Sequence, residues 1–137
     1  MIVGVGVDLI SIKRVDKACR RNPERFLKRL FSSAELALLA PRPAPVRSAA
    51  ARFAAKEAVL KAIGCGIGPA ALREVEILAP PGRKPQVRLS GHAARQAAAQ
   101  GITGIEVSLT HDPPFAAAIA VAYKRQESGG LEQEKEH

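Results

Sequence analysis

One segment, RFAAKEAVLKAIGCG at residues 52–66, constrains the fold of this chain more than any other. Alanine, leucine and lysine favour the helical state, and no proline interrupts the chain from Arg47 to Gly68. Gly64 is the residue type that commonly follows the last turn of a helix. The sequence therefore predicts a long central helix that ends near Gly64.

That helix carries a carboxylate among apolar neighbours. Phe53, Glu57 and Lys61 recur at a spacing of four residues, with Leu60 beside them, so they share one stripe of the helix surface. An exposed ion pair between Glu57 and Lys61 is one explanation, worth about 0.3–0.5 kcal/mol. The other is a packed carboxylate that needs a cation, either Lys61 or a metal ion, because an unpaired buried charge is costly.

The glycines that follow the helix favour a binding role. Gly64, Gly66 and Gly68 alternate along the chain. Glycine lets a ligand approach the backbone closely, and N–H groups in such a loop can face a phosphate.

Length and composition indicate one domain. A chain of 137 residues can bury a core without disulfides, and two cysteines, Cys19 and Cys65, are too few for a disulfide framework or a metal cluster. No apolar run approaches the ~18 residues that a membrane span requires, and the chain does not open with a secretory pattern. We expect a cytoplasmic protein without a membrane anchor.

The whole excess of positive over negative charge lies in the first half of the chain. Up to Lys61 there are thirteen Lys or Arg residues against five Asp or Glu, whereas the two kinds balance from Ala62 onward. Such a surface attracts nucleic acid, anionic membranes, acidic proteins or polyphosphates. Charge alone does not choose among these partners.

Residues 1–10 predict a strand with two very different faces. Val3, Val5 and Val7 would share one face, and the small residues Gly4 and Gly6 the other, which ends in Asp8. A dinucleotide-binding fingerprint is excluded because position 9 is leucine where a third glycine is required. Asp8 is a candidate either for capping the next helix or for a metal or catalytic role.

Two short basic helices are predicted after this strand. Ser11 can cap the first, to about Arg21, and Asn22 with Pro23 marks the start of the second. Asp16 and Glu24 are the only acidic residues in these two helices. The basic residues are Lys13, Arg14, Lys17, Arg20, Arg21, Arg25, Lys28 and Arg29. This run is either a solvated face or a docking surface for an acidic partner.

The remaining chain alternates between helical and strand patterns. Ser32 and Glu35 fit a capping box, and His111 stands at a strand end, where a functional side chain can project but where a structural or exposed histidine is the commoner case. The predicted elements are a hairpin at 74–78 and 86–89, a helix capped by Ser90 that runs through Gln100, and strands at 105–110 and 115–123. The alanines of 115–123 favour a helix, but its position after a tight turn and the segment IAV at 119–121 favour a strand. The fold class is therefore α+β, a small antiparallel sheet packed with a long central helix and shorter helices.

Three segments in this order resemble the 4′-phosphopantetheinyl transferases, specifically the small holo-[acyl-carrier-protein] synthase type. They are VGVD at 5–8, RFAAKEAVLKAIG at 52–64 with Gly66 and Gly68, and VSLTH at 107–111. The resemblance covers residues 1–123, which we take as the transferase domain, and leaves 124–137 as a charged tail.

The resemblance implies transfer of the phosphopantetheine arm of coenzyme A to a serine of apo acyl carrier protein, a step that serves fatty acid biosynthesis. It implies that Asp8 and Glu57 hold Mg²⁺, that Lys61 assists the departing phosphate, and that Glu57 or a metal-bound water takes the serine proton. The implied coenzyme A site comprises Lys61, Gly64, Gly66, Ser108 and His111. Lys56 is a candidate for phosphate binding or for a solvated helix position.

The same resemblance implies that Arg14 and Arg21, with Arg25 as a weaker extension, dock the acidic carrier protein, and that the chain forms a homotrimer.

Two other classes of function remain: a basic nucleic-acid-binding module and an inactive relative that binds carriers. The five aromatic residues leave little for stacking on bases, which disfavours the first. Intact Asp8, Glu57 and Lys61 disfavour the second.

Overall fold

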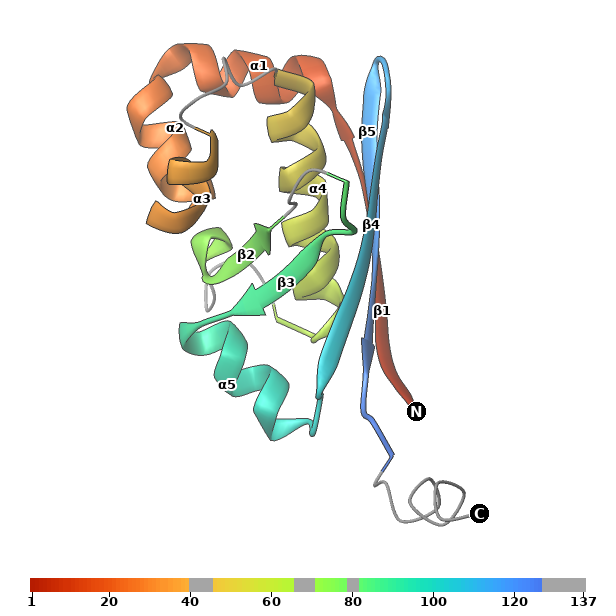
Figure 1. The fold of residues 1–137 in the computed structure, drawn as a ribbon. Coiled ribbons are helices and arrows are strands. Elements are labelled where there is room, and N and C mark those ends of the chain that lie inside the picture. The colour runs from red at the N-terminus through yellow and green to blue at the C-terminus, as the bar shows by residue number, and fades with distance from the viewer. Residues whose placement is uncertain (40–45, 66–70, 79–81, 127–137) are drawn as a thin grey trace.

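The computed structural model describes residues 1–39, 46–65, 71–78 and 82–126. Within these residues the chain has the predicted α+β architecture, with its elements arranged along one central helix (Figure 1). Their order is β1 (Ile2–Ser11), α1 (Ile12–Arg21), α2 (Pro23–Leu30), α3 (Ser33–Leu39), α4 (Val46–Ala62), the 3₁₀ helix η1 (Leu72–Glu74), β2 (Val75–Leu78), β3 (Gln86–Leu89), α5 (Gly91–Ala99), β4 (Gly104–Asp112) and β5 (Phe115–Tyr123).

The strands form two antiparallel sheets. The larger has the order β1-β5-β4, and the predicted hairpin β2-β3 forms the smaller. One row of the larger sheet aligns Asp8 with Ala118 and Leu109, and the next aligns Val7 with Ile119 and Ser108. Because neighbouring residues of a strand point to opposite faces, these two rows belong to different faces of the sheet.

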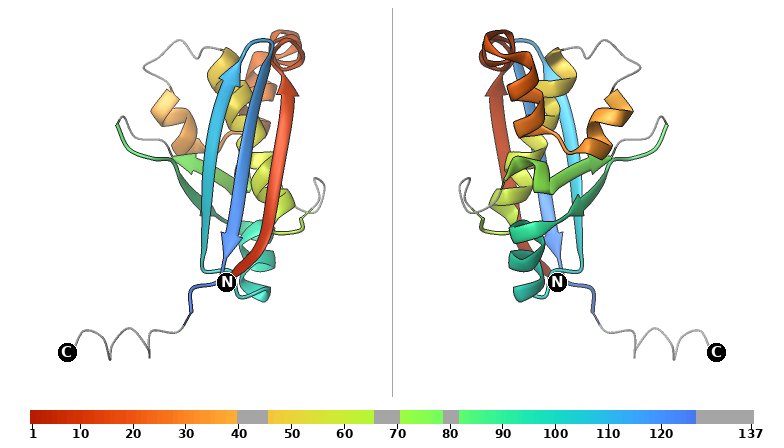
Figure 2. Two further views of the ribbon diagram at one scale, coloured as in Figure 1. Left: turned by 90° about the vertical axis from the view of Figure 1, so that its right-hand side faces the viewer. Right: turned by 90° about the vertical axis from the view of Figure 1, so that its left-hand side faces the viewer.

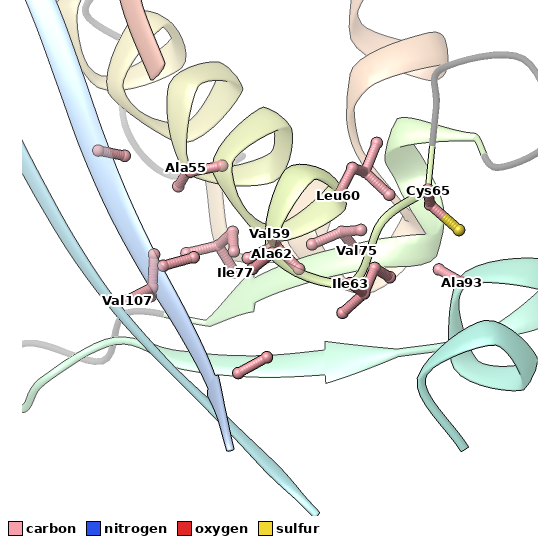
Figure 3. Close-up of a cluster of buried hydrophobic side chains, with 14 of the residues drawn as sticks. Ala55, Val59, Leu60, Ala62, Ile63, Cys65, Val75, Ile77, Ala93 and Val107 are labelled. Atoms are coloured by element: carbon pink, nitrogen blue, oxygen red, sulfur yellow. The ribbon is translucent and has the colours of Figure 1, made fainter. Parts of the chain in front are cut away.

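Helix α4 is the centre of the fold. It lies along one face of the larger sheet, with the hairpin and the other helices on its far side (Figures 1 and 2). Val59 of α4 and Ile63, directly after the helix, meet Val75 and Ile77 from β2 in the main core, and Val107 from β4 packs in the same cluster (Figure 3). Burial of this apolar surface is what fixes α4 against both sheets.

Two glycines of β1 let α4 approach this strand closely. A Cβ atom at Gly6 would lie 1.9 Å from the carbonyl oxygen of Ala58, and one at Gly4 would lie 2.0 Å from that of Ala62. Both contacts are with helix backbone, so a side chain at either position would push α4 away. The face of β1 that the sequence describes as nearly bare is therefore the packed face.

The opposite face of the larger sheet is apolar over β1 and β5 and has no described element over it (Figure 2, left). Val5, Val7 and Leu9 of β1 and Phe115 and Ile119 of β5 are all exposed. A monomer rarely leaves a contiguous apolar surface of this kind uncovered.

Most local predictions are confirmed. The side chains of Ser11 and Asn22 accept hydrogen bonds from Arg14 N and Arg25 N at the starts of α1 and α2. Ser32 and Glu35 form the predicted capping box, in which each side chain accepts from the other residue's N–H.

The predicted cap of α5 is wrong. The side chain of Ser90 makes no capping hydrogen bond, and the Glu74 carboxylate instead accepts from the N–H groups of His92 and Ala93 at 3.2 and 3.4 Å. A carboxylate suits the positive end of a helix dipole, and Glu74 reaches this position because η1 packs beside α5. A short-range pattern could not detect this tertiary contact.

Candidate functional site

Asp8 lies on the packed face of β1 and pairs with α4. Lys61 Nζ donates to Asp8 Oδ1 at 3.2 Å and to the carbonyl oxygen of Val7 at 3.0 Å. The alternative role for Asp8, capping the next helix, is wrong because Ser11 caps α1. The close contact of Gly4 and Gly6 with α4 is what brings Asp8 within reach of Lys61.

Glu57 completes a cluster of two carboxylates and one lysine. Burial raises the pKa of Glu57, the negative charge of Asp8 raises it further, and Lys61 opposes both effects. The ion pair of Lys61 is with Asp8, so an exposed Glu57–Lys61 pair is not what the structure describes. Negative charge is in excess at this cluster, which favours binding of a further cation.

The carboxylates open onto a hollow beside the basic helices. Asp8, Glu57 and Arg14 line a cavity of about 390 Å³, which we call the carboxylate hollow. Arg21 and Arg25 line an adjoining cavity of about 490 Å³, which we call the apolar hollow because its floor is mainly apolar. Ala18, Phe26 and Phe53 line both cavities. The structure thus places the three predicted docking arginines along one row with Asp8 and Glu57.

Ser108 and His111 lie elsewhere. They line a third cavity of about 480 Å³ between β4, α4 and the hairpin, together with Arg52 and Lys84. Asp8 lies on β1 at one edge of the larger sheet, His111 lies on β4 at the opposite edge, and α4 covers the face between them. Within the described residues, Asp8 and His111 thus line different cavities.

Both roles predicted for Lys56, phosphate binding and a solvated helix position, are wrong. Its side chain is fully buried, so it is neither solvated nor available to phosphate. Nζ donates to Glu35 Oε1 at 2.6 Å and to the carbonyl oxygens of Leu72 and Val75. Burial lowers the pKa of Lys56, and the Glu35 carboxylate counteracts that effect. This pair joins α3, α4 and β2 inside the protein.

Of the two predicted glycine contacts, only one is described. Gly64 adopts a positive φ of 72° after α4, and a Cβ there would meet no atom of the described residues within 4 Å. This open position is compatible with close approach of a ligand. Gly66 lies outside the described residues.

Arg52 and Lys84 are the additions to the predicted site. Arg52 lies one turn before Lys56 and donates from Nη1 to the carbonyl oxygen of Ile77 at 2.7 Å, and Lys84 pairs with Glu106. Both were visible as cations in the sequence, but only the packing of the hairpin against α4 places them beside His111.

No group of three or more His, Cys, Asp or Glu residues that could hold a metal ion occurs in the described parts of the chain. The Asp8–Glu57 pair would therefore supply two protein ligands only. Mg²⁺ commonly binds in this way, with one or two carboxylates and with water and substrate phosphate in its remaining positions.

Among the described helices, none has the length and hydropathy of a transmembrane span.

Comparison with known proteins gives a consistent result. Residues 4–122 match the model of the 4′-phosphopantetheinyl transferase superfamily. The holo-[acyl-carrier-protein] synthase of Desulforudis audaxviator is 48% identical over 128 residues, which cover 93% of this chain and 98% of that protein.

Solved structures agree with the sequence relatives. The holo-[acyl-carrier-protein] synthase of Neisseria meningitidis superposes with a TM-score of 0.81 at 32% identity, covering 90% of this chain and all of that one. The Helicobacter pylori enzyme, solved in complex with coenzyme A, gives a TM-score of 0.74 at 32% identity and covers 87% of this chain and 99% of its own.

Proposed function

This chain belongs to the 4′-phosphopantetheinyl transferase superfamily, and we propose that it carries out its reaction at the Asp8–Glu57–Lys61 cluster with Mg²⁺ as cofactor. The reaction is transfer of the 4′-phosphopantetheine group of coenzyme A to a serine of apo acyl carrier protein, which leaves adenosine 3′,5′-bisphosphate. The observation that carries the proposed site is the excess of carboxylate over lysine beside an open hollow.

The donor set fits Mg²⁺. Two carboxylates on a rigid strand and a rigid helix leave room for water and for the pyrophosphate oxygens of coenzyme A. A cation here would relieve the repulsion through which Asp8 raises the pKa of Glu57. Bound at this position, Mg²⁺ would neutralise pyrophosphate charge and so favour displacement at phosphorus.

The protein side chains have separate tasks in this proposal. Lys61, half-exposed and held by Asp8 and the Val7 carbonyl, presents its ammonium group to the departing phosphate and can donate a proton to it. Glu57, facing the carboxylate hollow, is positioned to accept the proton of the carrier serine. Arg14, in the same hollow, attracts the acidic carrier that presents this serine.

The division of the predicted contacts between two sheet edges supports a homotrimer. The exposed apolar face over β1 and β5 provides a surface that further copies can cover, and Ser108 lies in the same row as Val7 on that face. Contact through this face would bring Ser108, His111 and Gly64 of different copies toward one coenzyme A molecule. Light scattering of the purified protein tests the assembly, and a monomer at assay concentration would contradict it. A cytoplasmic location, expected from the sequence, completes the proposal.

Intact-mass spectrometry tests the function. Apo acyl carrier protein is incubated with this protein, coenzyme A and Mg²⁺, and a gain of one phosphopantetheine is expected. The gain should disappear with chelator and with Glu57→Ala. Asp16→Asn, an acid-to-amide control on α1 that lines neither hollow nor the cavity of Ser108 and His111, should keep it. Absence of a gain with several carriers would contradict the transfer, and persistence with chelator would contradict the metal.

A further inference from the structure

A fourth cavity, between α2 and η1, is lined mainly by cations. It has a volume of about 340 Å³, and its polar lining comprises Asn22, Glu24, Arg25, Lys28, Arg29 and Arg73. Arg73 comes from η1, far along the chain from α2, and reaches the cavity because η1 packs beside α2. We call this cavity the basic pocket.

The cations of the basic pocket lack protein partners among the described residues. Exposed Arg20, Lys84 and Arg88 each pair with a carboxylate, but Lys28, Arg29 and Arg73 have no such ion pair in the parts of the chain that the structure describes. Neighbouring like charges on a helix are slightly destabilising. The helix dipole compensates Lys28 and Arg29 in the last turn of α2, but it does not explain why Arg73 converges on them from another element.

The basic pocket continues the row of cavities that begins at the carboxylates. It shares Arg25 and Arg29 with the apolar hollow, which in turn shares Phe26 and Phe53 with the carboxylate hollow. A protein whose serine reaches Asp8 and Glu57 while the rest of it lies along this row would also contact the basic pocket. The carrier is such a protein, and its acidic surface complements the charge of the pocket.

We propose that the basic pocket binds an acidic segment of the carrier protein distinct from the one that meets Arg14 and Arg21, so that the carrier is held at two points. This inference rests on the proposed function. The second contact sets affinity for the intact carrier, while the chemistry at Asp8, Glu57 and Lys61 does not depend on it.

The test reverses the two cations of the pocket that lie outside the apolar hollow. Lys28→Glu/Arg73→Glu is expected to raise KM for apo carrier about tenfold or more, with kcat and KM for coenzyme A unchanged. The conservative pair Lys28→Arg/Arg73→Lys should keep the wild-type KM. Arg95→Glu/Arg125→Glu makes the same change in net charge at exposed positions outside the four cavities and controls for long-range attraction.

The outcomes are separable. An equal rise in KM for both charge-reversed proteins would show general attraction only and overturn the basic pocket as a docking site, as would an unchanged KM in the first. If Lys28→Glu/Arg73→Glu fails to fold, Lys28→Gln/Arg73→Gln replaces it with the same expectation at about threefold. Failure of the wild-type protein to transfer would contradict the proposed function instead.

Discussion

Helix α4 carries two charge clusters that differ in almost every physical respect. On the side toward β2, Lys56 and Glu35 form a fully buried ion pair. On the side toward β1, Asp8, Glu57 and Lys61 form a cluster whose lysine is 53% exposed and whose carboxylates line a hollow. Glu57 directly follows Lys56 in the sequence, so the buried cluster and the open cluster lie on different sides of the same turn of α4.

The buried cluster is fully satisfied. Lys56 donates to one carboxylate and two backbone carbonyls, and Glu35 also accepts from Ile77 N and Ser32 N. No buried side-chain N or O atom in the described residues lacks a hydrogen bond. Such a pair is costly to form but more costly to break, so it fixes the arrangement of α3, α4 and β2.

The open cluster is not balanced by the protein alone. Two carboxylates share one lysine, and their repulsion raises the pKa of Glu57. Charge on this helix therefore serves structure where the protein supplies every partner, and binding where it leaves a partner to be supplied. Three substitutions test this difference between the clusters.

The largest effect is expected from Lys56→Met. This change leaves the Glu35 carboxylate buried without its cation and should lower the free energy of unfolding by about 3–5 kcal/mol. Urea denaturation measures it. The double variant Glu35→Gln/Lys56→Met removes both charges and should recover part of the loss; a single variant as stable as wild type would contradict the structural role.

Asp8→Asn should act on transfer and barely on stability. Loss of one carboxylate from the proposed metal site should slow transfer about a hundredfold, equivalent to about 2.7 kcal/mol. In metal-free buffer the free energy of unfolding should change by less than about 1 kcal/mol, because the lost pair with Lys61 is partly exposed and Glu57 no longer faces a second carboxylate. Mass spectrometry measures the transfer rate and urea melts measure the stability, each compared with Asp16→Asn. Transfer by Asp8→Asn at the wild-type rate would contradict the assignment of Asp8 to the site.

The smallest effect on stability is expected at Glu76, which is buried near the Lys56–Glu35 pair but forms an ion pair with exposed Arg88. Hydrogen bonds from Arg88 and Ser32 hold the pKa of Glu76 below its ordinary value of 4.5. The stability from this group is therefore present above pH 4.5 and is lost as the pH falls below it. Arg88→Met should be less stable than wild type near pH 7, and the gap should narrow near pH 3. A gap that stays constant in urea melts across this range would contradict the pairing.

The sequence predicted the elements well because their signals are local. Ser11, Asn22 and the Ser32–Glu35 box each act within one helical turn, and the hairpin follows from alternation and turn residues. The strand at 115–123 was harder to predict, because its alanines favour a helix and only its place after a tight turn and the segment at 119–121 favour a strand. The segment at 52–64 likewise identified the helix that carries Glu57 and Lys61. These features do not depend on the rest of the fold.

The surroundings of that helix could not be predicted in the same way. Alanine occurs on every side of α4, so its pattern does not indicate which side is buried, and Lys56 has its partner 21 residues away at Glu35. The role of Glu74 at α5 and the gathering of Arg73 with the cations of α2 also depend on packing between distant segments. Side-chain environments of this kind are properties of tertiary structure.

The most direct test of the two-cluster account measures transfer and stability on the same proteins. Single-turnover rates from intact-mass spectrometry and unfolding free energies from urea melts would be compared for Glu57→Gln and for Glu35→Gln/Lys56→Met, at a temperature where both are folded. We predict that Glu57→Gln keeps its stability but transfers about a hundredfold more slowly, while the double variant is less stable but transfers within about threefold of wild type. The reverse pattern would place the chemistry at the buried pair and contradict the account.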